Sequence, residues 1–434
     1  MYKRIVMIGI ILLLIMIGNN HVASAYETGS LMSEKELYET NEDIRIIDMS
    51  PSCVYQEGHI PGAVNFYRED ISNPNALIPF MLAPTLQIEE LMAKIGVEEN
   101  QTILIYGQTP FDATRLWWIL KLYGHENVIV LNGNLETWEA NGYPLSKDIS
   151  EYPKTEYRID PNKIKIKMIA HINNVIEQMN KDTVLIDARD TDAYEGRIVA
   201  EGAERKGRIP NAINIPWEIH FDEDGRFKTV EELRDIYTKN GVHEGTSMIT
   251  YCHSGFQSTV NFFAITELLG YKNASNFDAS WIGWSGDVRL PIESDYCSFT
   301  VGNQQFELKG KQQTMDAVPY IKEDSMLAPL RYLALTLGIE DSDMEVQGKK
   351  MNLKKDGNII ELEVGSDKIR SNGVEQQLNI EPEVLQTGQI MVPVRSIAEV
   401  LGAVVSWDEI TKTTFIYLKE KSEPNVSSKN TAPT

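Results

Sequence analysis

The chain has 434 residues, too many for a single hydrophobic core, and its length indicates two to four domains. Hydrophobic residues make up 42% and charged residues 24% of the sequence, which is ordinary for globular domains, so disorder is not the default expectation. The formal net charge of −22 argues against nucleic acid or an anionic membrane surface as a partner.

The first segment, residues 1–25, has the pattern of a secretory signal peptide. Two basic residues, Lys3 and Arg4, precede an apolar run over residues 5–17, and residues 23–25 read Ala-Ser-Ala. The run is short for a bilayer span of roughly 20 residues, so cleavage is favoured over an uncleaved anchor. The sequence therefore predicts a secreted or extracytoplasmic protein with no stable membrane span after cleavage.

Most of the remaining chain is an internal repeat with an offset of roughly 140 residues. Apolar segments that end in an acid, 44–48 and 184–187, begin the two copies. Each copy continues, from Ile103 or Met248, as a buried strand, a loop, a helix, a further strand and a turn to tryptophan. Strands that alternate with helices predict two α/β domains with mainly parallel sheets flanked by helices.

A shorter repeat follows, LAPLRYLALTLG from Leu327 and MVPVRSIAEVLG from Met391. Each copy reads as a strand that enters a short helix through proline and is closed by glycine, Gly338 or Gly402. The alternating stretch 359–364 between them predicts an edge or half-buried strand, and the whole predicts an α+β domain. We therefore expect a signal peptide at 1–25, α/β domains at 26–150 and 151–295, an α+β domain at 296–420 and a disordered tail at 421–434.

The second α/β copy places Cys252 between a predicted strand and a predicted helix that begins near Ser258. A cysteine that faces backbone N–H groups and a helix N-terminus forms a stabilised thiolate, and the same groups can hold an anion. Gly255 permits the tight turn, and Ser258 or Thr259 can cap the helix. The alternative is a small buried structural cysteine. The first copy has Gly107 at this place, so that domain is expected to be catalytically silent.

Residues 30–290 resemble the tandem-domain rhodanese family, the thiosulfate and 3-mercaptopyruvate sulfurtransferases. The motifs that carry the resemblance are GHIPGAVN from Gly58, GRIPNAIN from Gly207, YCHSGFQS from Tyr251 and FDASWIGW from Phe277. The resemblance implies a persulfide cycle, in which the cysteine takes sulfane sulfur from a donor and passes it to cyanide or a thiol. It implies no metal and no organic cofactor.

Carried over residue by residue, the resemblance makes Cys252 the nucleophile. The loop that follows matches the family's substrate cradle: His253, Ser254, Gly255, Phe256 and Gln257. Asp187 and Arg189 match the strand-end acid and arginine that order the wall of the site, where Arg189 also faces the substrate, and Ser258 supports the loop. In the insertion 196–208 the basic residues, Arg208 above all, are candidates for a rim that attracts an anionic donor; a solvated loop is the equal alternative.

The donor stays open between thiosulfate, which we favour, and 3-mercaptopyruvate. Some thiosulfate-specific members have basic residues after the cysteine and an arginine before the tyrosine that matches Tyr194, where this chain has His253, Ser254 and Ala193. A related class, the cysteine phosphatases and arsenate reductases, needs Cys-x5-Arg, in which the arginine binds the oxyanion. Counted from Cys252, the place of that arginine is occupied by Ser258, so this class is excluded. A non-enzymatic cell-surface binding protein on the same scaffold remains a second alternative.

Residues 300–418 resemble the copper amine oxidase N-terminal-like stalk domain, through MVPVRSIAEVLGAVVSWDEITKTTFIY and the weaker LAPLRYLALTLG. The last histidine of the chain is His253 and no cysteine follows Cys297, so copper would find a poor ligand set and no metal is expected. The resemblance implies a spacer or attachment module, with the cell wall as a candidate contact. A disulfide between Cys53 and Cys297 is left open, and the preferred alternative is that Cys53 is simply a small buried residue.

Overall fold

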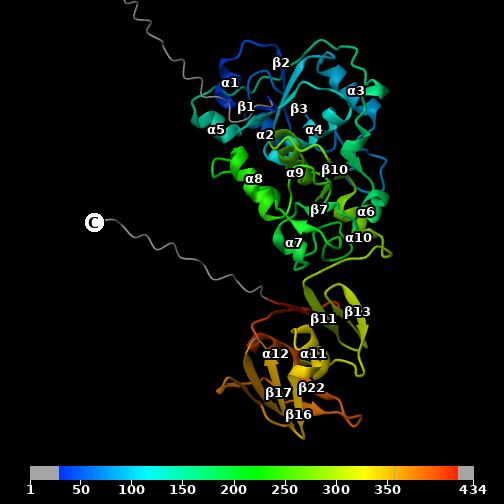
Figure 1. Ribbon diagram of the computed structural model, residues 1–434. Coiled ribbons are helices and arrows are strands. Elements are labelled where there is room, and N and C mark those ends of the chain that lie inside the picture. Colours follow the sequence, from blue (N-terminus) through cyan, green and yellow to red (C-terminus); the bar gives the residue numbers. More distant parts are fainter. Residues whose placement is uncertain (1–28, 356, 419–434) are drawn as a thin grey trace, which may run out of the picture.

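The computed structural model describes residues 29–355 and 357–418. The expected signal peptide at 1–25 and the expected tail at 421–434 lie outside the described residues. Within the described part of the chain, no helix combines the length and the apolar character that a membrane crossing requires. Three lobes follow one another along the chain, coloured blue to teal, green, and yellow to red in Figure 1.

The first and second lobes each contain a five-stranded sheet in which every pairing is parallel. The first sheet has the order β1 (Leu31–Ser33), β5 (Val128–Asn132), β4 (Thr102–Tyr106), β2 (Ile44–Asp48) and β3 (Val64–Asn65). The second has the order β6 (Ile169–Ala170), β10 (Ala274–Phe277), β9 (Met248–Tyr251), β7 (Val184–Asp187) and β8 (Ile213–Asn214). The equal strand order confirms that the long sequence repeat encodes two copies of one α/β fold.

Helices flank both sheets. In the first domain they are α1 (Glu34–Glu39), α2 (Ser52–Glu57), α3 (Thr85–Lys94), α4 (Pro110–Leu122) and α5 (Leu135–Ala140). In the second domain the α-helices are α6 (Ile172–Gln178), α7 (Thr191–Glu195), α8 (Val230–Lys239), α9 (Ser258–Phe263) and α10 (Ser280–Gly286). The second domain also has the short 3-10 helices η1 (Pro161–Lys163), η2 (Ile166–Met168) and η3 (Trp217–His220), and a π-helical turn, η4 (Ala264–Leu268), that continues α9.

The first two domains share one hydrophobic core, because α4 packs against α9 across the boundary. Trp117 of α4 meets Phe263 of α9 edge to face, with ring centroids 4.8 Å apart. The hydroxyls of Thr114 and Thr259, which occupy equivalent places in the two repeats, lie 2.8 Å from each other. A contact between equivalent positions is the signature of an approximate two-fold relation. The ends of β4 and β9 therefore both face the domain boundary.

The third domain contains three sheets whose strand pairings are all antiparallel. One has the order β13 (Lys311–Thr314), β12 (Gln305–Leu308), β11 (Tyr296–Thr300), β24 (Thr413–Tyr417) and β23 (Val404–Asp408). The second has the order β14 (Tyr320–Lys322), β15 (Ser325–Pro329), β22 (Ile390–Pro393) and β21 (Glu383–Val384). The third runs β16 (Met344–Gln347), β17 (Lys350–Lys355), β18 (Asn358–Glu363), β19 (Lys368–Ser371) and β20 (Val374–Gln377).

The short sequence repeat accounts for the two α-helices of this domain, α11 (Leu330–Thr336) and α12 (Val394–Val400). Each begins directly after the proline that ends a strand, and Gly338 and Gly402 follow the helix ends with φ of +75° and +82°. Both predicted strand–helix units are thus confirmed. The strand expected at 359–364 is β18; it lies in the middle of its sheet and alternates between buried and exposed side chains, so it is half-buried and not an edge strand.

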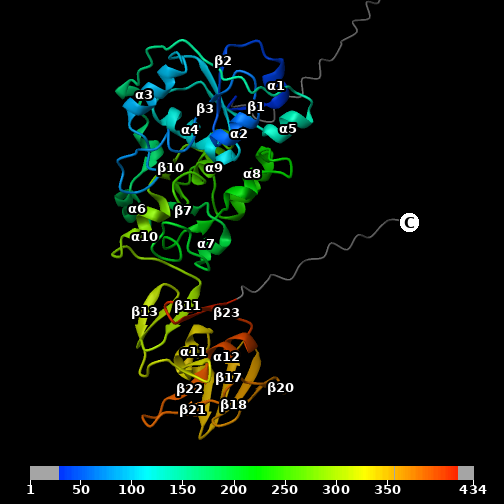
Figure 2. The same ribbon diagram turned by 180° about the vertical axis from the view of Figure 1, so that it is seen from behind.

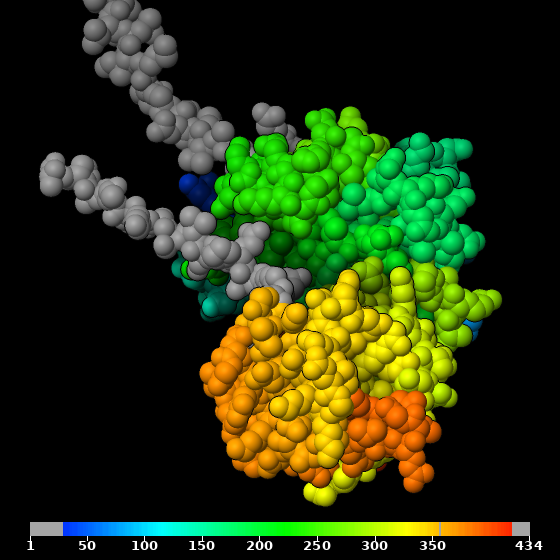
Figure 3. All heavy atoms as spheres, turned by 60° about the horizontal axis from the view of Figure 1, so that its bottom comes forward, coloured from blue at the N-terminus to red at the C-terminus, as the bar shows by residue number. Residues whose placement is uncertain are grey.

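The third domain contacts the insertion 196–208 of the second domain. The Lys206 ammonium lies 3.9 Å from the ring centre of Phe415, and the Tyr417 hydroxyl donates to the Arg197 carbonyl at 3.3 Å. Figure 2, seen from behind, and Figure 3, with the third domain in yellow and orange brought forward, show the two lobes next to each other. Cys297 is buried in the core of the third domain. Cys53 is exposed in the first domain, so the expectation that it is buried is wrong; neither cysteine is paired in a disulfide.

Candidate active site at Cys252

Cys252 follows the last residue of β9, at the carboxyl end of a central strand. Its N–H donates to the Ser280 hydroxyl at 3.1 Å, and its carbonyl accepts the N–H of Trp281 at 3.0 Å. The start of α10 therefore fixes the cysteine backbone from one side while β9 fixes it from the other. Only 1% of the residue is exposed.

Polar groups surround the thiol although it is buried. The N–H of Gly255 donates to Sγ at 3.2 Å, and the Ser258 hydroxyl lies 3.5 Å from Sγ. Gly255 has a φ of +83°, which turns its N–H back toward the sulfur. Donors of this kind stabilise a thiolate over a thiol, so the surroundings differ from those of a structural cysteine in apolar packing.

Ser258 does not cap α9, contrary to the expectation. The residue before it, Gln257, is already helical in φ and ψ, and no side chain caps this helix. The Ser258 hydroxyl instead donates to Oδ1 of Asn276 at 2.6 Å, besides its contact with the sulfur. A hydroxyl has one proton, so it can serve only one of these acceptors at a time. The Thr250 hydroxyl also donates to Asn276 Oδ1, at 3.2 Å, and keeps that oxygen paired when Ser258 turns to the sulfur.

Asn276 is a site residue that the sequence analysis missed. The strand register pairs it with Thr250, whereas the equivalent pair in the first sheet is Val130 with Ile105. The sequence did contain a signal for this residue: one repeat has a polar pair at buried strand positions where the other repeat has an apolar pair. Asn276 also donates from Nδ2 to the Gly255 carbonyl at 3.2 Å, so it holds the loop that follows Cys252.

The loop after Cys252 carries no positive side chain. The His253 ring lies with Nε2 2.7 Å from the Glu201 carbonyl, which can only accept, so Nε2 carries the proton. Burial lowers the pKa of His253, which keeps the ring neutral near pH 7. Phe256 is buried, and Ser254 and Gln257 are half-buried. The loop that was expected to hold the substrate thus offers backbone groups and neutral side chains.

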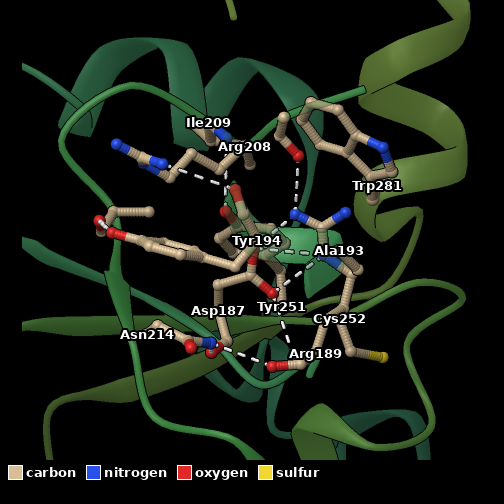
Figure 4. Close-up of polar contacts among 12 residues, drawn as sticks. Asp187, Arg189, Ala193, Tyr194, Arg208, Ile209, Asn214, Tyr251, Cys252 and Trp281 are labelled. Carbon is tan, nitrogen blue, oxygen red and sulfur yellow. Dashed lines mark hydrogen bonds and ion pairs between the residues drawn. The ribbon is translucent and has the colours of Figure 1, made fainter. Parts of the chain in front are cut away.

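Asp187 and Arg189 form a buried pair beside the cysteine, as Figure 4 shows. Arg189 donates from Nη2 to Asp187 Oδ2 at 2.5 Å and from the same nitrogen to the Gly207 carbonyl at 2.8 Å. Its guanidinium also lies 4.6 Å from the Trp281 ring centre. Removal of one partner from such a pair leaves a buried charge and costs about 3–5 kcal/mol. The pair therefore orders the wall of the site, and its positive charge is already matched by a carboxylate.

Arg208 does not form a rim for an anionic donor, and that expectation is corrected. Its guanidinium donates to Asp295 at 2.8 and 2.9 Å and to Glu293 at 2.8 Å, and only 6% of its side chain is exposed. Two carboxylates thus occupy its donors and tie down the segment that leads into β11. The insertion 196–208 is not merely a solvated loop either, because Arg205 donates to four backbone carbonyls in and after α10: Trp284, Ser285, Asp287 and Leu290.

The equivalent loop of the first domain has Gly107 after β4 and no sulfur. A cavity of about 290 Å³ lies there, and the second domain contributes Trp217, Phe221 and Phe227 to its lining. A Cβ at Gly107 would lie 3.1 Å from the Met49 side chain, so even a small residue forces a shift. Among the residues that the structure describes, no group of His, Cys, Asp and Glu side chains has the arrangement of a metal site.

The fold and the site define a protein with two rhodanese-like domains. The rhodanese-like domain family matches residues 33–141 and 172–287, together more than half of the chain. The chain belongs to this family, as a tandem rhodanese with a carboxy-terminal stalk-like domain. The copper amine oxidase N-terminal domain matches residues 307–416, which lie within the third domain. It also matches residues 259–345, whose first part the structure places in α9 to α10 of the second domain.

Several curated proteins are similar to the chain. A Haloferax volcanii protein named as a possible thiosulfate sulfurtransferase is 35% identical over 245 residues, which cover 55% of this chain and 84% of that protein. A Mycobacterium tuberculosis protein with the same name is 35% identical over 250 residues, 56% of this chain and 88% of that protein. The sulfur carrier protein TtuD of Thermus thermophilus is 30% identical over 277 residues, 60% of this chain and 95% of that protein.

Among solved structures, the anaerobic ergothioneine biosynthesis enzyme of Chlorobium limicola has a TM-score of 0.56 and 23% identity, over 62% of this chain and 71% of that one. At that identity the likeness shows the fold alone. The sequence relatives and the domain matches support rhodanese-type sulfurtransferase activity for this chain.

Proposed function

We propose that the chain moves sulfane sulfur from an anionic donor, thiosulfate in the first place, to cyanide or a thiol through a persulfide on Cys252. The observation that carries the proposal is the polar seat of the Cys252 sulfur, with the Gly255 N–H at 3.2 Å and the Ser258 hydroxyl at 3.5 Å. The first domain has glycine at the equivalent place, so the reaction is assigned to the second domain.

In the first half of the cycle, the Cys252 thiolate attacks the outer sulfur of thiosulfate. A new S–S bond forms on the enzyme, the S–S bond of thiosulfate breaks, and sulfite leaves with the electron pair. In the second half, cyanide or a thiolate attacks the outer sulfur of the persulfide. The enzyme S–S bond breaks, its electron pair returns to Cys252, and thiocyanate or a hydropersulfide leaves. No outside oxidant or reductant is needed.

The Ser258 hydroxyl follows the charge through this cycle. When Cys252 is a thiol, the hydroxyl donates to Asn276, which is the shorter contact. When the cysteine is ionised, the hydroxyl turns to the sulfur, and Asn276 stays paired through Thr250. The Ser258 hydroxyl thus donates a hydrogen bond where negative charge develops on the sulfur, and no polar group is left unpaired.

Thiosulfate is favoured over 3-mercaptopyruvate because curated relatives carry that name. The site itself offers few cations, since His253 is neutral and the charges of Arg189 and Arg208 are matched by carboxylates. This arrangement argues for slow capture of a doubly charged donor and keeps 3-mercaptopyruvate as the second candidate. A binding protein without activity is the third, and no observation in the site favours it.

Incubation of the purified chain with either donor tests the proposal. We expect thiosulfate to add one sulfur atom to Cys252 and to release one equivalent of sulfite, and we expect a slower reaction with 3-mercaptopyruvate. The measurements are the mass of the Cys252 peptide and an assay of the released product. If neither donor modifies Cys252 in folded protein, the enzymatic proposal falls and the binding-protein alternative takes its place.

We also propose that the protein works outside the cytoplasm, with the third domain as a spacer or attachment module. The support is the pattern of residues 1–25 and the acidic composition. We expect the exported protein to begin at Tyr26, and the intact mass of protein recovered outside the cytoplasm checks this. Recovery of the chain only from the cytoplasm, with residues 1–25 intact, would contradict it.

A further inference from the structure

We propose that Arg115, a residue of the first domain, is a positioning residue for Cys252 of the second domain. The inference rests on the proposed function, because it assigns the first domain a part in the same persulfide chemistry. Arg115 lies on α4, at the shared core, and is fully buried. It reaches across the boundary to the loop that holds the sulfur.

Arg115 holds Gly255 directly. Its Nη1 donates to the Gly255 carbonyl at 3.0 Å, and its Nη2 donates to the Phe80 carbonyl at 3.1 Å. The guanidinium carbon lies 4.9 Å from the ring centre of Phe256 and 4.8 Å from that of Trp118. Two directed hydrogen bonds and two aromatic neighbours fix both the place and the plane of the guanidinium.

The charge of Arg115 is matched by Asp278, the residue after β10. Arg115 Nη2 lies 2.7 Å from Asp278 Oδ1, in an ion pair with both side chains excluded from solvent. Asp278 Oδ2 accepts the N–H of Leu82 at 2.9 Å, which is a second bond across the domain boundary. The Asp278 carbonyl lies 2.6 Å from the place that a Cβ on Gly255 would take. Arg115 and Asp278 therefore enclose Gly255 from two sides.

Gly255 passes this restraint on to the sulfur. Its carbonyl is held by Arg115 and Asn276, and its N–H donates to Cys252 Sγ. Because both groups belong to one residue with a φ of +83°, the direction of the N–H depends on where the carbonyl is held. A loop without Arg115 keeps the same atoms but loses the restraint that aims the donor at the thiolate.

The two repeats differ at this place. The offset that aligns Gly107 with Cys252 and Thr114 with Thr259 aligns Arg115 with Val260. The arginine thus occurs only in the domain without the sulfur and points to the loop with it. A buried charge pair is a costly way to fill a core position that valine fills in the other repeat, which favours a role beyond packing.

Arg115→Lys is the main test, because lysine keeps the charge for Asp278 but cannot hold two carbonyls with a planar fork. Thr114→Val is the matched control: it removes the neighbouring cross-domain hydrogen bond to Thr259 and leaves Gly255 untouched. Both variants are made in the full chain with Cys53→Ser, so that the exposed thiol does not react. The readouts are the pH profile of Cys252 alkylation by iodoacetamide and the kcat and KM with thiosulfate.

We expect Arg115→Lys to slow alkylation near pH 7 about tenfold and to move the pH profile upward, because an ordered donor to the thiolate is lost. We expect kcat to fall by a similar factor and the KM for thiosulfate to change little, since thiosulfate does not contact the buried Arg115. Thr114→Val changes thermal unfolding but leaves the pH profile in place. A folded Arg115→Lys protein with the profile of the parent overturns the proposal.

Arg115→Met with Asp278→Asn covers the case in which Arg115→Lys does not fold. The double variant leaves no buried unpaired charge, and the asparagine amide oxygen still accepts from Leu82. The same shift of the alkylation profile is expected. If neither protein folds, Arg115 is a core residue only and the proposal is overturned. If the alkylation profile shifts in the Arg115 variants but neither thiosulfate nor 3-mercaptopyruvate forms a persulfide in the parent protein, the proposed function is refuted and the positioning role of Arg115 stands.

Discussion

Cys252→Ser is expected to lower sulfur transfer from any donor by at least about a thousandfold, because the hydroxyl cannot form the persulfide on which the proposed cycle depends. Serine is close to cysteine in size, and donors already surround this place, so the variant is expected to fold. The measurements are sulfite release from thiosulfate and the mass of the peptide that contains residue 252.

Cys53→Ser is the matched control, since it also exchanges sulfur for oxygen but at an exposed cysteine of the first domain. We expect this protein to keep the activity of the parent. Equal activity in the parent and in Cys252→Ser would remove Cys252 from the mechanism. Loss of activity in Cys53→Ser alone would move the sulfur carrier to the first domain.

Gly255→Ala is expected to lower persulfide formation by about a hundredfold or more, although no reacting atom is changed. The new Cβ would lie 2.6 Å from the Asp278 carbonyl, so the loop must move and take its N–H away from Cys252. A misplacement on the order of 1 Å costs about this factor in rate. The φ of +83° adds a strain of about 1–2 kcal/mol.

Gly241→Ala separates the two effects. Gly241 has a φ of +76°, but no atom lies within 4 Å of the place of its Cβ, so this variant carries the backbone strain alone. We expect both proteins to unfold at lower temperature than the parent, Gly255→Ala by more, and only Gly255→Ala to lose persulfide formation. Normal sulfur loading in Gly255→Ala would mean that the loop geometry does not control the reaction.

Much of the fold was predictable because the same order of strands, loops and helices can be recognised in both repeats. Apolar segments that recur with the same order of loops and helices gave the strands 44–48, 184–187 and 248–251, which coincide with β2, β7 and β9. The place of Cys252 after β9 followed from the same pattern. These features depend on local periodicity and on chain order, and both are visible in a single sequence.

The parts of the site that were missed or wrong depend on contacts between distant segments. Arg208 looked like a free cation in a loop, but Glu293 and Asp295, far along the chain, bind it. Ser258 looked like a helix cap, but it is itself the first residue of α9, and its hydroxyl turns to Asn276. Arg115 lay in a helix of the domain expected to be silent, and only the packing of α4 against α9 brings it to Gly255.

The insertion 196–208 touches two parts of the molecule at once. Its Glu201 carbonyl accepts from His253, the residue after Cys252, and its Lys206 lies over Phe415 of the third domain. A ligand that shifts β24 must therefore either break the Lys206 contact or move the insertion. If the insertion moves, the ligand and the sulfur on Cys252 are thermodynamically linked. The factor by which the ligand changes the equilibrium constant for sulfur binding then equals the factor by which bound sulfur changes the affinity for the ligand. The stalk-like domain would then report the loading state of an atom that it never touches.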